Sequence, residues 1–375
     1  MKALRYSDAK GLRVEEVPIP SPGPDECLVK IIRAGICSTD LEIIRGYVPG
    51  FDHTLGHEFV GVVAQVHPGS VSHPSVLGQR VVGEINCRTC PCEHPDPIFV
   101  RNHAPDRTVL GIIGKDGCMA EYVTLPIENL HVVPDDITDA EACFCEPLAA
   151  ACRIIEQSIL LGTPPLPSNS PSNRTFIVGV IGDGKLGILV AHVLAQHVRD
   201  TTNHLESQVV FFGHHAHKVN LVRGVVPVVI PSKQSSGDGS GENDELEHIE
   251  NTYTSTFDVI VEATGSPEGI LMALKFCRPL GTIVQKSTCS VVVKDPSKMP
   301  VWSTVANDIV VNEKKLVGSR CGPFPPALEL LRDGGTKELV RRMIDVEKRF
   351  SSGAVEAIEE AQRKGRLKVQ LVMQE

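Results

Sequence analysis

The sequence predicts two domains: a barrel-like domain of small antiparallel strands, followed by a doubly wound α/β domain. Before residue 150, apolar runs are short and interrupted by Gly and Pro, whereas after residue 174 they are continuous and end at Gly or Pro. Interrupted runs indicate antiparallel strands, and continuous runs indicate parallel strands covered on both faces. A chain of 375 residues with 42% apolar side chains is long enough to bury two such cores.

The elements follow from these runs in chain order. We expect antiparallel strands at CLVKIIRAG, FVGVVAQVHPG, QRVVGEI, AEYVTL and LHVVP, and parallel strands at TFIVGVIG, QVVFFG, VVPVVI, FDVIVEATG and GTIVQKS. KLGILVAHVLAQH carries apolar residues at three- and four-residue spacing, which predicts a helix. The final segment, AVEAIEEAQRKGRLKVQLVM, predicts a helix, a turn and a strand. The Pro/Ser-rich residues 163–173 and the acidic, Gly/Ser-rich residues 231–251 are expected to be exposed loops.

Composition restricts the class of protein. The net charge is −9 and no Lys/Arg run is long enough to attract a polyanion, so we do not expect a nucleic-acid partner. No apolar stretch has the length of a signal peptide or a membrane span, and we expect a cytoplasmic protein without a membrane partner. Its twelve cysteines are then thiols, some of them metal ligands.

The glycine motif VGVIGDGKLG predicts a dinucleotide site. Gly182, Gly184 and Gly187 form G-x-G-x-x-G between an apolar strand and the clearest helix of the chain. The first glycine permits a tight turn, the second lets a pyrophosphate approach the backbone, and the third lets the helix pack on the strand. The free N–H groups at the start of the helix then face the phosphates.

The residues after the next strand bear on the choice of dinucleotide. NAD sites usually carry an acid there, which binds the ribose 2′-hydroxyl. Here the strand is followed by Gly213, His214 and His215, and no Asp or Glu occurs between Ser207 and Gly237. Lys218 or a protonated histidine would attract a 2′-phosphate, so the pattern favours NADP, with NAD as the alternative.

Four residues are candidates for a catalytic zinc site, which needs three protein ligands and an open position. Cys37 and His57 offer a thiolate and an imidazole, and Cys145 and Glu146 offer a thiolate and a carboxylate. Taken singly, each is an ordinary core or turn residue. Their presence in one chain with a dinucleotide motif strengthens the metal interpretation.

In chain order, ICSTDLE, LGHEFVG, GCMAEYVTLP, EPLAA, the G-x-G-x-x-G unit and FDVIVEATGSP resemble the zinc-dependent medium-chain dehydrogenase/reductase family of alcohol and polyol dehydrogenases. The resemblance implies an α/β plus β fold, in which a GroES-like catalytic β domain is joined to a Rossmann cofactor domain. The implied limits are residues 1–152 for the catalytic domain, 153–319 for the dinucleotide-binding domain, and 320–375 for a segment that completes the catalytic domain.

The resemblance also implies roles for individual residues. Cys37, His57 and Glu146 correspond to the catalytic-zinc ligands, with Cys145 as the rival third ligand. Asp40 would hold the ring of His57, and Glu58 would lie close behind the zinc. Thr39 would pass on the substrate proton, although Glu42 replaces the histidine that continues this relay in several relatives. Cofactor contacts are implied for the remaining motif positions, Lys185, Leu186, Thr264 and Gly265.

A second zinc site is incomplete in the sequence. Relatives carry four cysteines at C-x2-C-x2-C-x7-C, whereas this chain keeps Cys87, Cys90 and Cys92 with one spacing short and has Ala104 near the fourth position. His103 could complete a set of four ligands, as could His94. The alternative is a metal-free loop held by packing.

The resemblance implies hydride transfer between a secondary alcohol or polyol, or its ketone or aldehyde, and NADP or NAD with the aid of Zn²⁺. The substrate is a small molecule, and KKLVGS (314–319) could pair at a sheet edge to form a homodimer or part of a tetramer. Two other classes remain open. One is a zinc-independent NADPH quinone or enone reductase, and the other is a non-enzymatic dinucleotide-binding redox sensor.

Overall fold

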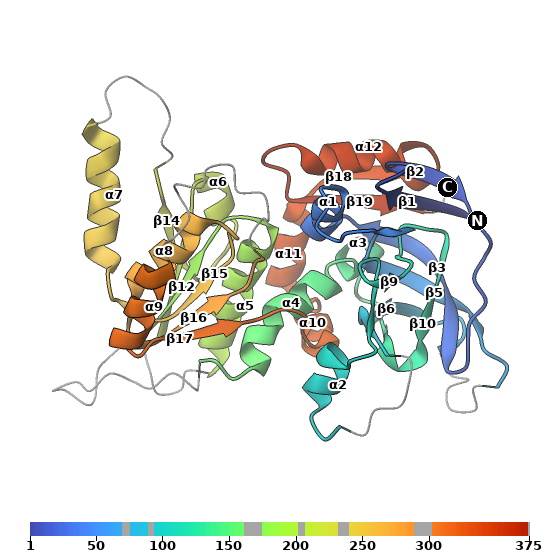
Figure 1. Ribbon diagram of the computed structural model, residues 1–375, viewed down its shortest axis with the longest axis horizontal. Coiled ribbons are helices and arrows are strands. Elements are labelled where there is room, and N and C mark those ends of the chain that lie inside the picture. Colours follow the sequence, from blue (N-terminus) through green and yellow to red (C-terminus); the bar gives the residue numbers. More distant parts are fainter. Residues whose placement is uncertain are drawn as a thin grey trace. The chain divides into compact units, whose positions relative to one another are not determined.

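The computed structural model describes residues 1–69, 76–88, 94–160, 175–201, 207–231, 240–288 and 302–373. The chain forms two compact units (Figure 1). One consists of Met1–Ala149 together with Phe324–Glu375, and the other of Ala150–Pro323. These limits differ by a few residues from the expected domain boundaries, which stay a prediction.

The main sheet of the first unit has seven strands and is antiparallel except for its last pair. Its strand order is β11-β6-β5-β3-β19-β18, and β10 also pairs with β3. The strands are β3 (Glu26–Gly35), β5 (Glu58–Val66), β6 (Arg80–Gly83), β10 (Tyr122–Pro126), β11 (Leu130–Val132), β18 (Ile344–Arg349) and β19 (Lys368–Val372). The C-terminal strand β19 therefore pairs directly with β3 near the start of the chain.

Two three-stranded sheets and several helices complete this unit. The first small sheet has the order β2 (Arg13–Glu16), β1 (Lys2–Ser7), β4 (Asp52–Thr54), and the second β7 (Asn86–Cys87), β8 (Thr108–Leu110), β9 (Gly114–Lys115). The helices are α1 (Ser38–Ile44), α2 (Pro97–His103), α3 (Asp139–Ala142), α4 (Cys145–Glu156, which continues into the second unit), α10 (Phe324–Leu330), α11 (Gly334–Met343) and α12 (Phe350–Gln362). α12 packs along β18 and β19 (Figure 1).

The second unit is a six-stranded parallel sheet with the order β14-β13-β12-β15-β16-β17. The strands are β12 (Phe176–Ile181), β13 (Ser207–Gly213), β14 (Val226–Val229), β15 (Phe257–Glu262), β16 (Cys277–Gln285) and β17 (Lys315–Gly318). The order reverses between β12 and β15, and ligands of such sheets bind outside the carboxyl ends of the strands at that point. The predicted fold class is confirmed.

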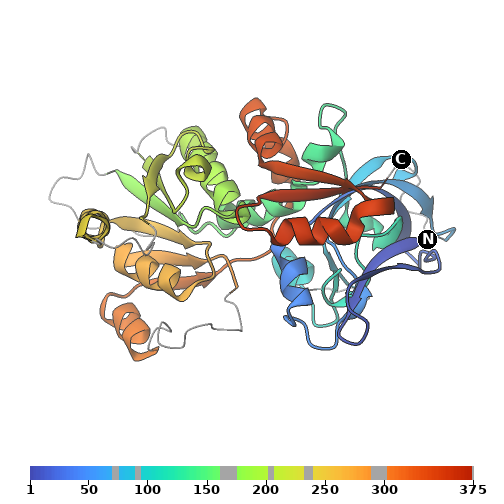
Figure 2. The same cartoon turned by 90° about the horizontal axis from the view of Figure 1, so that it is seen from above.

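Helices cover both faces of this sheet: α5 (Lys185–Thr201), α6 (Ala216–Val219), α7 (Ser240–Tyr253), α8 (Pro267–Phe276) and α9 (Trp302–Val311). Right-handed crossovers in opposite directions from the reversal place α5 and α8 on opposite faces, and Figure 2 shows the green α5 and the orange α8 on either side of the strands.

The prediction of a loop over residues 231–251 is wrong for its second half, because α7 begins at Ser240. The acidic, polar composition concealed an apolar stripe. Leu246, Ile249 and Tyr253 recur at three- and four-residue spacing and pack on the core around Phe212 and Phe257. Tertiary packing of this stripe stabilises a helix whose average composition indicates a loop. The predicted loop at 163–173 lies outside the described residues.

In the described part of the chain, no helix is both long and apolar enough to cross a membrane.

Replacing Ile249 by Ala tests the packing of α7. Ile249 is 7% exposed, so its truncation is expected to lower the free energy of unfolding by about 2–5 kcal/mol, as for other buried aliphatic residues. Urea denaturation followed by circular dichroism measures the loss. Glu247→Ala, at an exposed position of the same helix, is the matched control and should change stability by less than ~0.5 kcal/mol. Equal effects of the two variants would contradict the packing of α7.

Candidate functional site

Cys37 lies where the chain leaves the main sheet of the first unit. β3 ends at Gly35, and α1 begins at Ser38. The backbone N–H of Cys37 donates to Oδ2 of Asp40 at 2.8 Å, which closes the first turn of the helix. The Cys37 thiol remains partly exposed and lies 3.7 Å from the hydroxyl of Thr39. The turn therefore presents the thiol and this hydroxyl side by side.

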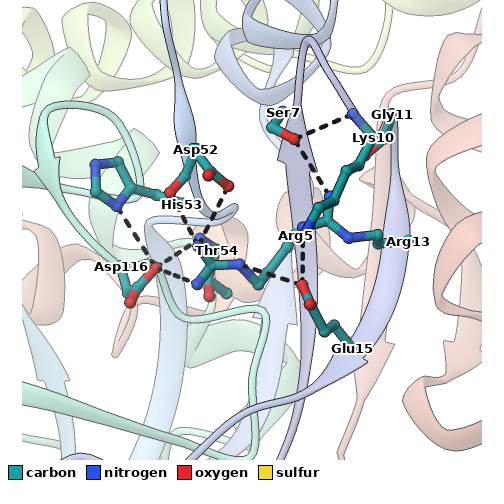
Figure 3. A network of polar contacts seen from close by, with 10 residues as sticks. All are labelled: Arg5, Ser7, Lys10, Gly11, Arg13, Glu15, Asp52, His53, Thr54 and Asp116. Carbon is teal, nitrogen blue, oxygen red and sulfur yellow. Dashed lines mark hydrogen bonds and ion pairs between the residues drawn. The ribbon is translucent and has the colours of Figure 1, made fainter.

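His57 is positioned by β4, which a polar network holds against β1. Figure 3 shows Arg5 of β1 between acidic groups from three segments. Its Nη2 donates to the Asp52 carbonyl at 2.9 Å, and its Nη1 donates to Asp116 Oδ1 at 3.2 Å. The same Asp116 oxygen accepts the backbone N–H of Thr54 at 2.7 Å. These bonds fix the end of β4, three residues before His57.

Gly56 makes the turn from β4 to His57. Its φ of +97° lies in a region that side chains disfavour, and a Cβ there would lie 2.6 Å from Met119 Cγ. Its N–H donates to Asp40 Oδ1 at 3.1 Å. Asp40 therefore receives one N–H from the turn before α1 and one from the turn before His57, and it joins the two turns that carry the candidate ligands.

Asp40 also sets the charge around His57. Both side chains are buried, and His57 Nδ1 lies 3.5 Å from Asp40 Oδ1 without forming a hydrogen bond to any described residue. Burial disfavours a charged imidazole, but Asp40 and Cys37 outweigh it and hold the pKa of His57 well above its ordinary value. A buried imidazole surrounded by negative groups is a site that attracts a cation.

Among the described residues, Cys37, His57 and Glu58 offer ligand atoms that all lie within 4.8 Å of one another. Glu58 is the first residue of β5 and pairs with Gly35 on β3. A Cβ on Gly35 would overlap Oε2 of Glu58, so the glycine makes room for the carboxylate. Thiolate, imidazole and carboxylate are the usual ligands of zinc, and this group of side chains fits such an ion.

Glu58 pairs with Lys368, a residue for which the sequence predicts no role at the site. Lys368 Nζ donates to Glu58 Oε2 at 2.5 Å, and both side chains are almost fully buried. Burial disfavours the ammonium, but Glu58, followed by Cys37 and Glu146, outweighs it and raises the pKa of Lys368. Lys368 stays charged and neutralises Glu58. No local sequence signal could have revealed the pair, because 310 residues separate its members.

The predicted third ligand, Glu146, lies in the first turn of α4. It is near enough to Lys368 to contribute to the raised pKa of that lysine, but it is not part of the group of described residues within 4.8 Å. Its rival Cys145 is buried, with Sγ 4.0 Å from the carbonyl of Phe324. Glu42, at the outer relay position, pairs with Arg45 at 2.6 Å.

The glycine motif joins β12 to α5. Gly182 has a φ of +114°, and a Cβ on Gly187 would overlap the Gly182 carbonyl oxygen. The backbone conformation and packing of the loop therefore require glycine at both positions, whether or not a ligand binds. Gly184 differs, because a Cβ there would meet no atom within 4 Å. Open space beside the second glycine fits the approach of a pyrophosphate, whose oxygens would face the N–H groups at Lys185 and Leu186 in the first turn of α5.

The loop after β15 is shaped by a buried acid. Glu262 accepts the Thr264 N–H at 2.6 Å, the Gly265 N–H at 3.1 Å, and Nε2 of Gln285 at 2.6 Å. The Thr264 hydroxyl also donates to it. Thr264 further contacts the glycine motif, since a Cβ on Gly182 would lie 2.8 Å from its methyl group. The two predicted cofactor-binding loops are therefore neighbours.

The predicted residues after β13 lie in distinct environments. Gly213 ends the strand, and a side chain there would overlap Asp183 of the glycine motif. His214 Nδ1 lies 3.0 Å from the Ile230 carbonyl, and His215 pairs with Asp183. Lys218 is buried.

The possible second zinc site is only partly within the described residues, because Cys90 and Cys92 lie outside them. Cys87 is in β7 and is 2% exposed, and burial raises the pKa of its thiol to about 12. Asn129 Nδ2 lies 3.6 Å from its sulfur. His103 is the last residue of α2 and is exposed. A buried cysteine of this kind is typical of a packing residue.

Known proteins resemble this chain over different lengths. Residues 23–135 match the alcohol dehydrogenase GroES-like domain. An L-threonine 3-dehydrogenase of Stenotrophomonas maltophilia (strain K279a) is 34% identical over 206 residues, which are 52% of this chain and 54% of that protein. The chain thus spans about half the length of the curated relatives it matches.

Solved structures match the whole chain. A protein of Sinorhizobium meliloti 1021, named as a zinc-binding dehydrogenase and bound to NADP, is 25% identical, covers 99% of both chains and has a TM-score of 0.74. Galactitol-1-phosphate dehydrogenase from Escherichia coli, at 21% identity, covers 100% of both chains with a TM-score of 0.76. At the latter identity the similarity concerns the fold alone.

Replacing Lys368 by Met should destabilise the protein by about 3–5 kcal/mol at pH 7, because Glu58 is left as an unpaired buried charge. Urea denaturation measures this loss. Lys348→Met removes an exposed ion pair, Lys348–Glu356 at 3.5 Å, and should cost less than ~1 kcal/mol.

Adding Glu58→Gln to Lys368→Met removes the unpaired charge and should restore part of the lost stability. A Lys368→Met variant as stable as the control would contradict the buried pair.

Proposed function

Because the chain belongs to the medium-chain dehydrogenase/reductase family that contains the zinc-dependent alcohol and polyol dehydrogenases, we propose that it is a zinc-dependent oxidoreductase. It transfers hydride between a secondary alcohol or polyol, or the corresponding ketone or aldehyde, and NADP. The observation that carries the proposal is the convergence of Cys37, His57 and Glu58 within 4.8 Å. The open space at Gly184 of the same chain supports a dinucleotide partner.

Cys37 and His57 hold the zinc, with Glu146 as the third protein ligand. Glu58 is closer to the other two, but its Oε2 is bonded to Lys368 and its charge is neutralised there. Pairing with a buried ammonium weakens a carboxylate as a metal ligand, so Glu58 acts behind the ion. Asp40 keeps the ring of His57 in place, as carboxylates do for ligating histidines.

Other residues of the chain accept the substrate proton and bind the cofactor. Bound zinc acts as a Lewis acid, which lowers the pKa of a substrate hydroxyl or polarises a carbonyl. Thr39, whose hydroxyl lies 3.7 Å from the Cys37 sulfur, accepts the substrate proton. The backbone around Gly184 and the start of α5 bind the pyrophosphate, and the loop at Thr264 and Gly265 supports the rest of the cofactor.

The two other classes are less favoured. A zinc-independent reductase has no use for a thiol, an imidazole and a carboxylate brought together at one point. A redox sensor needs the dinucleotide site alone. The joint presence of both groups supports an enzyme.

The proposed enzyme is cytoplasmic and forms a homo-oligomer through β17, the edge strand of the parallel sheet. Leu316 of β17 is 46% exposed, and Val310 and Val311 at the end of α9 are 73% and 79% exposed. Among the described residues, no strand pairs with the outer edge of β17. A sheet edge of this kind next to exposed apolar side chains is typical of a surface that pairs with a second copy. Light scattering measures the mass of the assembly. The wild type is expected to have the mass of a dimer, and the double variant Leu316→Lys, Val311→Lys is expected to have the mass of a monomer. A monomeric wild type would contradict this assembly.

Cys37→Ser and His57→Ala test the metal site. Each variant is expected to lose most of its zinc, measured by elemental analysis, and to lose turnover by at least about a hundredfold, while NADPH still binds as measured by fluorescence titration. Cys152→Ser, a buried cysteine of the other unit, is the control and should keep its zinc. Full activity without zinc would favour the zinc-independent reductase, and NADPH binding without hydride transfer to any substrate would favour the sensor.

Elemental analysis of zinc also distinguishes Glu58 from Glu146 as the third ligand. Glu146→Gln is expected to lower zinc content more than Glu58→Gln, and the reverse would make Glu58 the third ligand. Substrate class is read from nicotinamide absorbance with polyols, sugar alcohols and simple secondary alcohols, each with both cofactors.

A further inference from the structure

A carboxylate lies at the end of β13, although the sequence has no acid in that loop. Asp183, between the first two glycines of the motif, reaches His215 by two contacts. The backbone N–H of His215 donates to Asp183 Oδ2 at 2.7 Å, and His215 Nδ1 lies 2.9 Å from the same oxygen. The glycine loop and the loop after β13 are therefore tied together by a single side chain.

The contact fixes the state of the His215 ring. A carboxylate oxygen only accepts, so Nδ1 carries the proton. Nε2 is then the ring nitrogen available to a ligand, and it donates when the ring is protonated. The His215 side chain is 38% exposed, whereas that of Asp183 is 12% exposed. Of the two side chains, His215 is therefore the more accessible to a ligand.

Gly213 makes room for this arrangement. A Cβ on Gly213 would overlap Asp183 Cβ and lie 2.7 Å from its Oδ2. Many NAD sites carry the ribose-binding acid at the end of this strand. Here the residue is Gly213, and the side chain of Asp183 occupies the space that a side chain at this position would fill. His214 is held elsewhere, with Nδ1 3.0 Å from the Ile230 carbonyl.

From these contacts we propose that Asp183 is a positioning residue that aims His215 at the 2′-phosphate of NADP. This inference rests on the proposed dinucleotide function and names the residues that select between the two dinucleotides. Charge-assisted hydrogen bonds from an oriented donor to a phosphate are among the stronger polar contacts in proteins. The pair is a substitute for the arginine that accommodates a 2′-phosphate in other sites.

A different role for Asp183 has the opposite consequence. If Asp183 itself accepted the ribose 2′-hydroxyl, its charge would repel a 2′-phosphate and the chain would prefer NAD. The lower exposure of Asp183, and the use of one oxygen for both contacts with His215, favour the positioning role.

The experiment compares two nucleotides that differ only in the 2′-phosphate, adenosine 2′,5′-bisphosphate and 5′-AMP. Their dissociation constants are measured by calorimetry on the full chain, so the readout needs neither zinc nor hydride transfer. Asp183→Ala and His215→Asn are each expected to weaken the bisphosphate about tenfold, with 5′-AMP changed less than about twofold. If Asp183 and His215 only stabilise the loop, the two variants should weaken the binding of both nucleotides equally, and that outcome would overturn the proposal.

His217→Asn is the matched control, because His217 stacks edge-on against His215 at 5.7 Å but is not the residue paired with Asp183. It should leave the ratio of the two constants within about twofold of the wild type. If His217→Asn weakened bisphosphate binding as much as His215→Asn does, selectivity would come from general positive charge, and the proposed role of the Asp183–His215 pair would be wrong.

Two further outcomes are decisive. Asp183→Asn keeps the shape and removes the charge. If it strengthens the bisphosphate and weakens 5′-AMP, Asp183 is the ribose acceptor and the proposal is wrong. If the folded wild type, confirmed by its thermal transition, binds neither nucleotide, the dinucleotide function fails and the inference fails with it. A wild type that binds 5′-AMP as tightly as the bisphosphate would refute the inference alone.

Discussion

The candidate metal site depends on the buried ion pair between Glu58 and Lys368. Removing two charges from water is costly, and the cost is offset only where the partners are close and well aligned. The partners are 2.5 Å apart, with both side chains almost fully buried. Because Glu58 begins β5 and Lys368 begins β19, the pair joins two strands that both flank β3. The site therefore requires the C-terminal segment to fold back onto the first unit.

The charges around the site explain why a cation fits there. Cys37, Asp40 and Glu58 supply acidic groups around His57, and Lys368 neutralises one of them. Asp40 is further occupied by two backbone N–H groups. Burial disfavours a charged imidazole, but Asp40, followed by Cys37, outweighs it and keeps the pKa of His57 high. A divalent ion between a thiolate and a neutral imidazole would take the place of that proton.

Local patterns sufficed to predict most strands of the two large sheets and the α5 helix, because each depends on residues near it in the sequence. The pairing of Cys37 with His57 was implied by the family resemblance. Local patterns failed where a partner comes from elsewhere. Lys368 has no local signal. The acid at the end of β13 was absent from the strand, yet Asp183 supplies one in space. α7 was missed because Ile249 stabilises it through contacts with a distant core. In each case the deciding interaction is long-range.

Gly35 and Gly213 show the same constraint in both units. Neither has a positive φ, so neither is required for a turn. Each stands opposite an acid from another segment, Glu58 or Asp183, that fills the space a Cβ would occupy. A glycine inside or at the end of a strand weakens it, and the loss is offset only if the acid is better placed. The absence of a side chain at each glycine therefore serves to accommodate the acid that packs against it. Gly35 makes room for Glu58 at the candidate metal site, and Gly213 makes room for Asp183, which pairs with His215.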